Sequence, residues 1–119
     1  MAVSAAHYQQ LSLSGPRHVV VAAGDLDAGA AEELAAALDV PIEMGKTQIV
    51  LDLTAVRFMD SMAIHVLMGA ARELRQRFGK LVLVCTDRHT RRLVEITKLD
   101  VVAPVFATRE AALRGPLDV

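Results

Sequence analysis

Two patterns of apolar and polar residues mark the strands of this chain. Polar and apolar residues alternate over residues 8–13, and a β-branched run occupies residues 18–23, with a Gly-Pro break between them. This arrangement predicts an opening hairpin. Nearly continuous apolar runs over residues 48–53 and 81–85 predict strands that are covered on both faces. A last short strand is expected at residues 105–106.

Helical spacing of apolar residues marks the segments between these strands. Pro41 is expected to end the first helix, and Gly79 the second. Asp87 and Thr108 are expected to cap the third and fourth helices, because their side chains can accept a hydrogen bond from a helix amide. The predicted helices cover residues 30–38, 61–78, 88–99 and 109–114.

Strands and helices therefore alternate along most of the chain after the hairpin. Such alternation favours an α/β domain in which helices connect the strands of a mixed, mostly parallel sheet. We expect about four to five strands and about four helices. With 119 residues, 53% of them apolar, the chain is long enough for one domain and too short for two ordinary ones. A single domain is expected over residues 1–119, with its core over about residues 8–114.

The charge balance argues against a protein that binds polyanions. The chain has 13 basic and 14 acidic side chains, so its net charge is −1. A nearly neutral chain lacks the attraction on which non-specific binding to nucleic acid or to an anionic membrane depends. Arg88, Arg91 and Arg92 form a small basic cluster, which this balance favours as a solvated helix face over an RNA site. No direct contact with nucleic acid is expected.

The residues that commonly hold metals or cofactors are scattered. His7, His18, His65 and His89 are far apart in the sequence, and the single cysteine, Cys85, falls in a predicted buried strand. This pattern predicts neither a metal site nor a reactive thiol. The chain also lacks a Gly-rich phosphate loop with a lysine, so we expect no ATP site and no cofactor.

Two further absences concern the cellular location. The first ten residues lack the cationic start and the apolar core of a secretory signal. No apolar run approaches the roughly 20 residues that span a bilayer. A cytoplasmic protein without membrane insertion is therefore expected.

The segment from Ile49 to Leu67 carries the clearest chemical signal. A buried strand is followed by a short turn over residues 54–60 and by Asp60-Ser61 at the start of a helix. Unpaired N–H groups at a helix start carry partial positive charge, so a phosphoryl group on Ser61 would be partly stabilised there. It would add about −1.5 to −2 charges beside Asp60. The simpler interpretation is that Asp60 or Ser61 only caps the helix.

Asp60, Ser61 and His65 also supply the residue types of a nucleophilic triad. Ser61 and His65 are four residues apart and can share a helix face. Asp60 directly precedes the nucleophile, so it is poorly placed to orient a histidine one turn further on. The chain also has no Gly-x-Ser-x-Gly motif. Hydrolysis by Ser61 is therefore disfavoured, and no enzymatic activity is expected.

The segment around Asp60 and Ser61 resembles a known family signature. It looks like the part of the STAS domain of bacterial anti-sigma factor antagonists in which a phosphorylatable serine follows an aspartate. The similar residues are Asp52-Leu53-Thr54, Val56, Phe58-Met59-Asp60-Ser61 and Ile64. Other segments are similar to the family in order and spacing, namely residues 24–27, 94–100, 105–106 and 108–113. The resemblance spans about residues 8–114.

This resemblance implies a STAS-like fold and a regulator that changes partners rather than a catalyst. In the family, the unphosphorylated antagonist binds an anti-sigma factor that is also a serine kinase, and the sigma factor is freed. Phosphorylation by that kinase switches the antagonist off. Carried over by position, Ser61 is the phosphorylation site. The partner-binding residues implied are Asp25, Asp27, Asp60, Ser61, Met62 and His65. A monomer or weak dimer is expected.

Three residues depart from the family pattern. Met62 and Ala63 follow Ser61, where the family usually has Ser or Thr and then Gly, and Lys98 stands at a common Gly. These changes leave a second function open. In that alternative, the same fold is a non-phosphorylated STAS subunit of a phospholipid transport complex or of a stress-signalling scaffold.

Overall fold

The computed structural model describes residues 6–114, in which strands and helices alternate as the sequence predicts. The strands are β1 (His7–Ser12), β2 (Arg17–Leu26), β3 (Gln48–Met59), β4 (Lys80–Val84) and β5 (Val105–Phe106). The helices are the 3-10 turn η1 (Ala28–Ala30), α1 (Ala31–Glu43), α2 (Ser61–Gln76), α3 (Arg88–Ile96), α4 (Leu99–Val102) and α5 (Arg109–Arg114). The predicted α/β class is confirmed, with one more α-helix in the described residues than expected.

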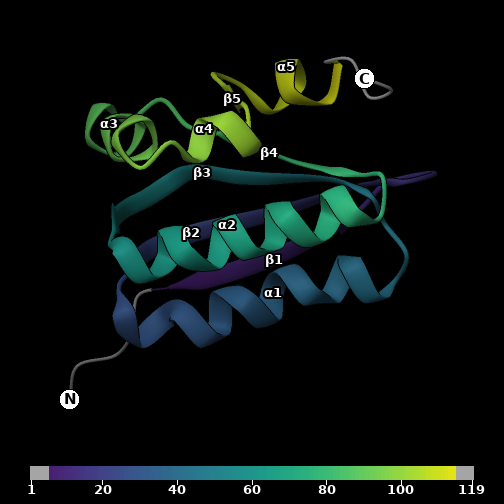
Figure 1. The fold of residues 1–119 in the computed structure, drawn as a ribbon, viewed down its shortest axis with the longest axis horizontal. Coiled ribbons are helices and arrows are strands. Elements are labelled where there is room, and N and C mark those ends of the chain that lie inside the picture. The colour runs from purple at the N-terminus through teal and green to yellow at the C-terminus, as the bar shows by residue number, and fades with distance from the viewer. Residues whose placement is uncertain (1–5, 115–119) are drawn as a thin grey trace.

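The five strands form one sheet in which they follow the order of the chain. β1 and β2 are an antiparallel hairpin, whereas β2–β3, β3–β4 and β4–β5 are parallel pairs. The mixed, mostly parallel sheet predicted from the sequence is thus confirmed. Because β2, β3 and β4 are parallel, their carboxyl ends meet at one edge of the sheet. The helices that follow these strands begin at that end of the molecule (Figure 1).

Most buried apolar side chains lie on the face of the sheet that α1 and α2 cover. Leu34 and Leu38 of α1 pack in this core with Leu67 and Leu74 of α2, as their helical spacing predicts. A smaller apolar cluster lies on the strands beneath α5, which contributes Ala112 to it. Figure 1 shows α1 and α2 running side by side along the sheet, with α5 on the far side of β4.

Pro41 does not end the first helix, contrary to the prediction. α1 continues through it to Glu43. A proline has no amide hydrogen, so the carbonyl of Ala37, four residues earlier, loses its helical donor. Gln10 of β1 supplies another, because its Nε2 donates to Ala37 O at 2.8 Å. Gln10 Oε1 accepts in turn from His18 Nε2 at 2.7 Å, so the hairpin completes the hydrogen bonding that proline interrupts.

The segment predicted as a turn, residues 54–60, is strand as far as Met59. β3 keeps its pairing with β2 over this stretch through two register shifts. β2 is also longer than predicted and ends at Leu26, directly opposite Met59. Only Asp60 therefore separates β3 from α2. The long strand pair fixes the start of α2 against the end of β2.

α2 ends at Gln76, and Phe78, which is predicted inside the helix, lies beyond it. Phe78 has a φ of 61° and is 96% exposed, so it contributes nothing to the apolar face. Gly79 follows and meets the loop before β3: a Cβ atom on Gly79 would lie 2.2 Å from Thr47 O. A close approach between two chain segments therefore requires glycine at this position. Gly79 also follows the end of α2, as the sequence predicts.

The third predicted helix is broken into two. The recurrence of Leu93, Ile96 and Leu99 predicts one continuous helix, but α3 ends at Ile96 and α4 begins at Leu99. Between them Lys98 adopts the left-handed conformation, with a φ of 65°. The break places Leu99 in the core and leaves Ile96 exposed. The prediction is wrong because the chain turns at Lys98, the position at which the family commonly has glycine.

Replacing Lys98 by glycine should stabilise the protein. A left-handed residue with a Cβ atom costs about 1–2 kcal/mol, a cost that glycine avoids. The greater freedom of glycine in the unfolded chain offsets part of this gain. We therefore expect the free energy of unfolding, measured by urea titration, to rise by about 1 kcal/mol. Lys98→Ala keeps the Cβ atom and is the matched control; an equal gain in both variants would contradict this explanation.

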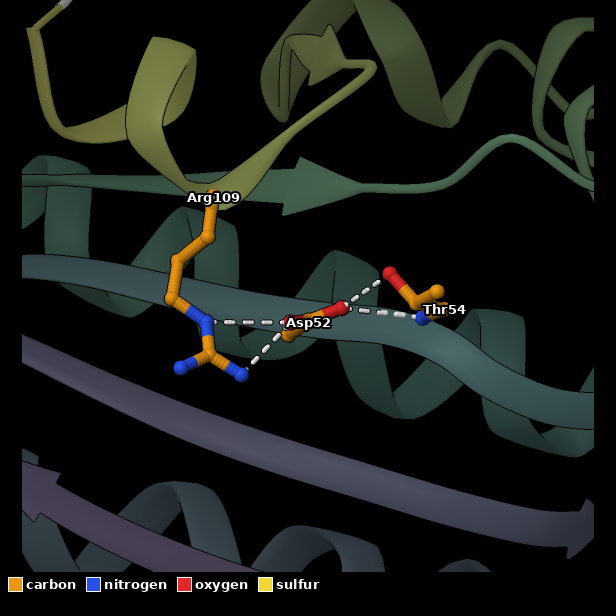
Figure 2. A network of polar contacts seen from close by, with 3 residues as sticks. All are labelled: Asp52, Thr54 and Arg109. Atoms are coloured by element: carbon orange, nitrogen blue, oxygen red, sulfur yellow. Dashed lines mark hydrogen bonds and ion pairs between the residues drawn. The ribbon is translucent and has the colours of Figure 1, made fainter.

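A side-chain network ties α5 to β3 (Figure 2). Arg109 donates from Nε and Nη2 to Asp52 Oδ2, at 3.1 and 2.9 Å. Thr54 donates to Asp52 Oδ1 through both its amide and its hydroxyl. Burial by itself would raise the pKa of the Asp52 carboxyl, but the hydrogen bonds from Thr54 and Arg109 outweigh burial and hold that pKa below its usual value. Asp52, in the family-like segment, therefore has a structural role under α5.

Arg109→Gln should lower the free energy of unfolding by about 1–2 kcal/mol near neutral pH, because it weakens hydrogen bonds to a buried carboxylate. This expected loss lies at the low end of the range for hydrogen bonds to charged groups, because the Arg109 side chain is 43% exposed. The pKa of Asp52 is lowered in the folded protein, so this stabilisation is present above about pH 4 and is lost as the pH falls further. The difference between wild type and variant should shrink in urea titrations at acid pH.

Arg114→Gln, on the same helix, provides the control for Arg109→Gln. Arg114 is exposed, so its replacement should change stability by less than about 0.5 kcal/mol. A stability loss in Arg109→Gln that stays constant from neutral to acid pH would show that the ion pair with Asp52 is not its source.

Candidate functional site

Asp60 forms the cap at the start of α2. Its backbone is extended, and its Oδ1 accepts hydrogen bonds from Met62 N at 3.0 Å and from Ala63 N at 3.2 Å. The Asp60 amide donates to Leu26 O at 3.1 Å, which joins the start of α2 to the end of β2. The cap expected from the sequence is therefore present, and it belongs to Asp60 rather than to Ser61.

Ser61 lies at the surface on the first turn of α2. Met62 and His65, on the same turn and the next, are exposed as well, whereas Ala63 is fully buried in the core. The methyl group of Ala63, an addition relative to the family's glycine, thus leaves the surface around Ser61 unchanged. Ser61 and His65 border a hollow of about 270 Å³ that continues along α2. Ser61 is thus exposed to solvent.

The loop between β2 and α1 lies beside this helix start. Asp25 sits near the end of β2, where its carboxylate pairs with Arg57 Nε at 3.5 Å. Asp27 caps η1, because its Oδ1 accepts from Ala30 N at 3.1 Å. The structure therefore brings the predicted partner-binding residues to one edge of the sheet and leaves their binding role as a prediction.

Phe58 belongs to the same edge, and sequence reasoning did not assign it to the surface. It lies opposite Asp25 in the register of β2 and β3, and its ring is 51% exposed. Phe58 and the 48% exposed Met62 add apolar area to an edge that also carries Arg57 and three aspartates. Regular alternation could not have found Phe58, because Arg57 and Phe58 are both exposed beside a register shift in the strand pair.

The arrangement of Asp60, Ser61 and His65 does not make a catalytic triad. Asp60 Oδ1 is engaged by helix amides, and over residues 6–114 no hydrogen bond joins Ser61 to His65 or His65 to Asp60. A nucleophilic serine needs a base within hydrogen-bond reach and an orienting group behind that base. The site presents a serine without the groups that would activate it.

The other candidate groups lie away from this site. Cys85 is buried directly after β4, as the apolar run around it predicts, and this burial raises the pKa of its thiol. In the described part of the chain, no group of three or more histidine, cysteine or acidic side chains could hold a metal ion. Nor does any helix between residues 6 and 114 have both the length and the hydropathy to cross a membrane.

Comparison with known proteins identifies the family to which the chain belongs. The STAS domain model matches residues 10–112. The anti-sigma-B factor antagonist of Listeria monocytogenes is 39% identical over 80 residues, which cover 67% of this chain and 70% of that protein. BtrV of Bordetella bronchiseptica is 35% identical over 89 residues, or 75% of this chain and 77% of BtrV.

Solved structures agree with the sequence relatives. An anti-sigma factor antagonist from Mycobacterium paratuberculosis superposes with a TM-score of 0.84 at 26% identity, covering 93% of this chain and 96% of that one. The antagonist SpoIIAA in its unphosphorylated form gives a TM-score of 0.72 at 25% identity, covering 92% and 100%. SpoIIAA of Bacillus in its phosphorylated form gives 0.70 at 26% identity, covering 90% and 96%. This chain belongs to the STAS domain family, alongside anti-sigma factor antagonists.

Proposed function

We propose that this protein is an anti-sigma factor antagonist that phosphorylation of Ser61 switches off. The observation that carries the proposal is an exposed Ser61 on the first turn of α2, directly after a capping Asp60. Relatives with similar sequences and folds are anti-sigma factor antagonists, and one of them, SpoIIAA, has been solved in both phosphorylated and unphosphorylated forms. The proposed partner is an anti-sigma factor with serine kinase activity, which this protein, as a monomer or weak dimer in the cytoplasm, binds in order to release a sigma factor.

The binding surface proposed for the unphosphorylated protein is the edge of the sheet at the start of α2. Asp27, Asp60 and Asp25, which pairs with Arg57, supply carboxylates there, and Met62 and His65 supply exposed contact area. A methionine adapts to irregular partner surfaces, and a rim of carboxylates favours a basic partner surface. These groups are held in place by caps and strand pairing, so little ordering is required on binding.

Phosphorylation of Ser61 would act through charge at this surface. The amides of Met62 and Ala63, which could otherwise receive a phosphoryl group, already donate to Asp60 Oδ1. A dianion on Ser61 would therefore be left beside the Asp60 carboxylate without an internal donor at these positions. Burying it in the interface would remove its hydration, and that cost opposes binding unless the partner supplies a cation. Release of the partner then needs no refolding of the STAS domain.

Phosphosite mapping after incubation with the cognate serine kinase and ATP tests this proposal. The chain has four serines, Ser4, Ser12, Ser14 and Ser61, and we expect the phosphoryl group on Ser61 alone. Ser61→Ala should abolish phosphorylation. Ser14→Ala, which also removes an exposed serine but in the β1–β2 turn, should not affect it. Phosphate on another serine, or none at all, would refute the switch and favour the non-phosphorylated STAS subunit instead.

A further inference from the structure

Three arginines on the outer face of α3 have no part in the Ser61 site. Arg88, Arg91 and Arg92 follow one another at i, i+3 and i+4, so their side chains project from one face of the helix. All three are exposed, and together with Thr86 and Glu95 they line a hollow of about 360 Å³.

The positive charges of these arginines are not neutralised by other side chains of the described fold. Over residues 6–114, none of the three guanidinium groups donates a hydrogen bond or pairs with a carboxylate. The carboxylate nearest in sequence, Asp87, is engaged in capping α3 through Thr90. Glu95 borders the hollow but forms no ion pair with the arginines.

The positions of these arginines are electrostatically unfavourable for α3. Like charges at i, i+3 and i+4 repel one another. The positive end of the helix dipole lies at the amino terminus of α3, where positive side chains are unfavourable. A bound anion would offset this repulsion, because it would be attracted by all three guanidinium groups. The cluster therefore has the charge pattern of a site that is stabilised by an external anion.

We propose that this face of α3 binds a phosphate monoester. Guanidinium groups present forked donors that match phosphate oxygens, and clusters of arginine are a common means of recognising phosphoryl groups. Three arginines around one hollow, which Thr86 also lines, match a compact dianion with several acceptor oxygens. The monoester can come from a phosphorylated side chain of a protein or from a nucleotide.

A long nucleic acid fits this face less well. The basic area is limited to one short helix on a chain of net charge −1; Asp87 caps this helix and Glu95 lines the hollow. Binding to nucleic acid relies on a basic surface that follows several phosphates. The nearly balanced charge of the chain, which argues against an RNA site, is thus compatible with binding of a single phosphoryl group.

The test is to titrate each probe into the full chain and to monitor binding through amide chemical shifts in NMR spectra. The probes are a short peptide with one phosphoserine, adenosine monophosphate, inorganic phosphate and a short single-stranded RNA. The variant is Arg88→Gln/Arg92→Gln. Its control, Arg72→Gln/Arg75→Gln, removes two exposed arginines from α2 and changes the net charge equally. Glutamine retains the helix propensity of these positions.

We expect saturable shifts over residues 86–95 with at least one monoester, and about tenfold or more weaker binding in Arg88→Gln/Arg92→Gln than in the control. The monoester that binds more tightly identifies the source as protein or nucleotide. The proposal is overturned by an equal loss in both variants, by binding of inorganic phosphate only, by tighter binding of the RNA, or by no shifts on α3. It does not depend on Ser61, so Ser61→Ala should bind the same probes unchanged.

Discussion

Ser61→Asp should weaken binding to the anti-sigma factor by about 100-fold or more, whereas Ser61→Ala should keep nearly wild-type affinity. An uncompensated charge buried in an interface costs about 2–5 kcal/mol, and a 100-fold loss corresponds to about 2.7 kcal/mol. The new carboxylate would lie beside Asp60, whose Oδ1 already holds the amides of Met62 and Ala63. Calorimetric titration of each variant with the anti-sigma factor measures the effect.

Ser14→Asp is the matched control for this result. Ser14, like Ser61, is exposed, but it lies in the β1–β2 turn, away from the start of α2, and the charge change is the same. Its affinity should stay within about twofold of wild type, as expected of a charge outside the interface. Equal affinity of Ser61→Asp and Ser61→Ala would show that Ser61 lies outside the interface.

Gly79→Ala should destabilise the protein strongly. The new Cβ atom would lie 2.2 Å from Thr47 O and 2.8 Å from Thr47 Cβ. Thr47 O accepts from Lys80 N at 2.8 Å, so moving it away would disturb the entry into β4. We expect a loss of about 3 kcal/mol in the free energy of unfolding, at the upper end for overpacking. Urea titration followed by circular dichroism measures it.

Gly69→Ala provides the contrast. Gly69 lies within α2, and a Cβ atom there would meet nothing within 4 Å. Because alanine favours helix over glycine by about 0.5–1 kcal/mol, this variant should be more stable than wild type. If Gly79→Ala were as stable as Gly69→Ala, the close approach to Thr47 would not be the reason for the glycine.

The elements that are easiest to predict from this sequence are those that a local pattern of apolar and polar residues specifies. The buried strands around Leu51 and Leu83 are continuous apolar runs, and the face of α2 that carries Leu67 and Leu74 has helical spacing. Asp60 is an N-cap residue in front of an apolar helix face, so the position of the candidate site followed from local pattern.

The errors arise where a distant residue decides the local conformation. α1 passes through Pro41 because Gln10, on another strand, donates to the carbonyl that proline leaves unpaired. β3 continues to Met59 because β2 pairs with it, although its last residues lack a regular apolar pattern. At Lys98 and Phe78 the backbone is left-handed, a conformation that side chains of this size give no signal for.

The most direct test of switching at Ser61 is to titrate the anti-sigma factor with this protein in its unphosphorylated form and in a form phosphorylated at Ser61 alone. We predict tight binding by the unphosphorylated protein and at least about 100-fold weaker binding by the phosphorylated protein. Equal affinity of the two forms would contradict the proposed mechanism.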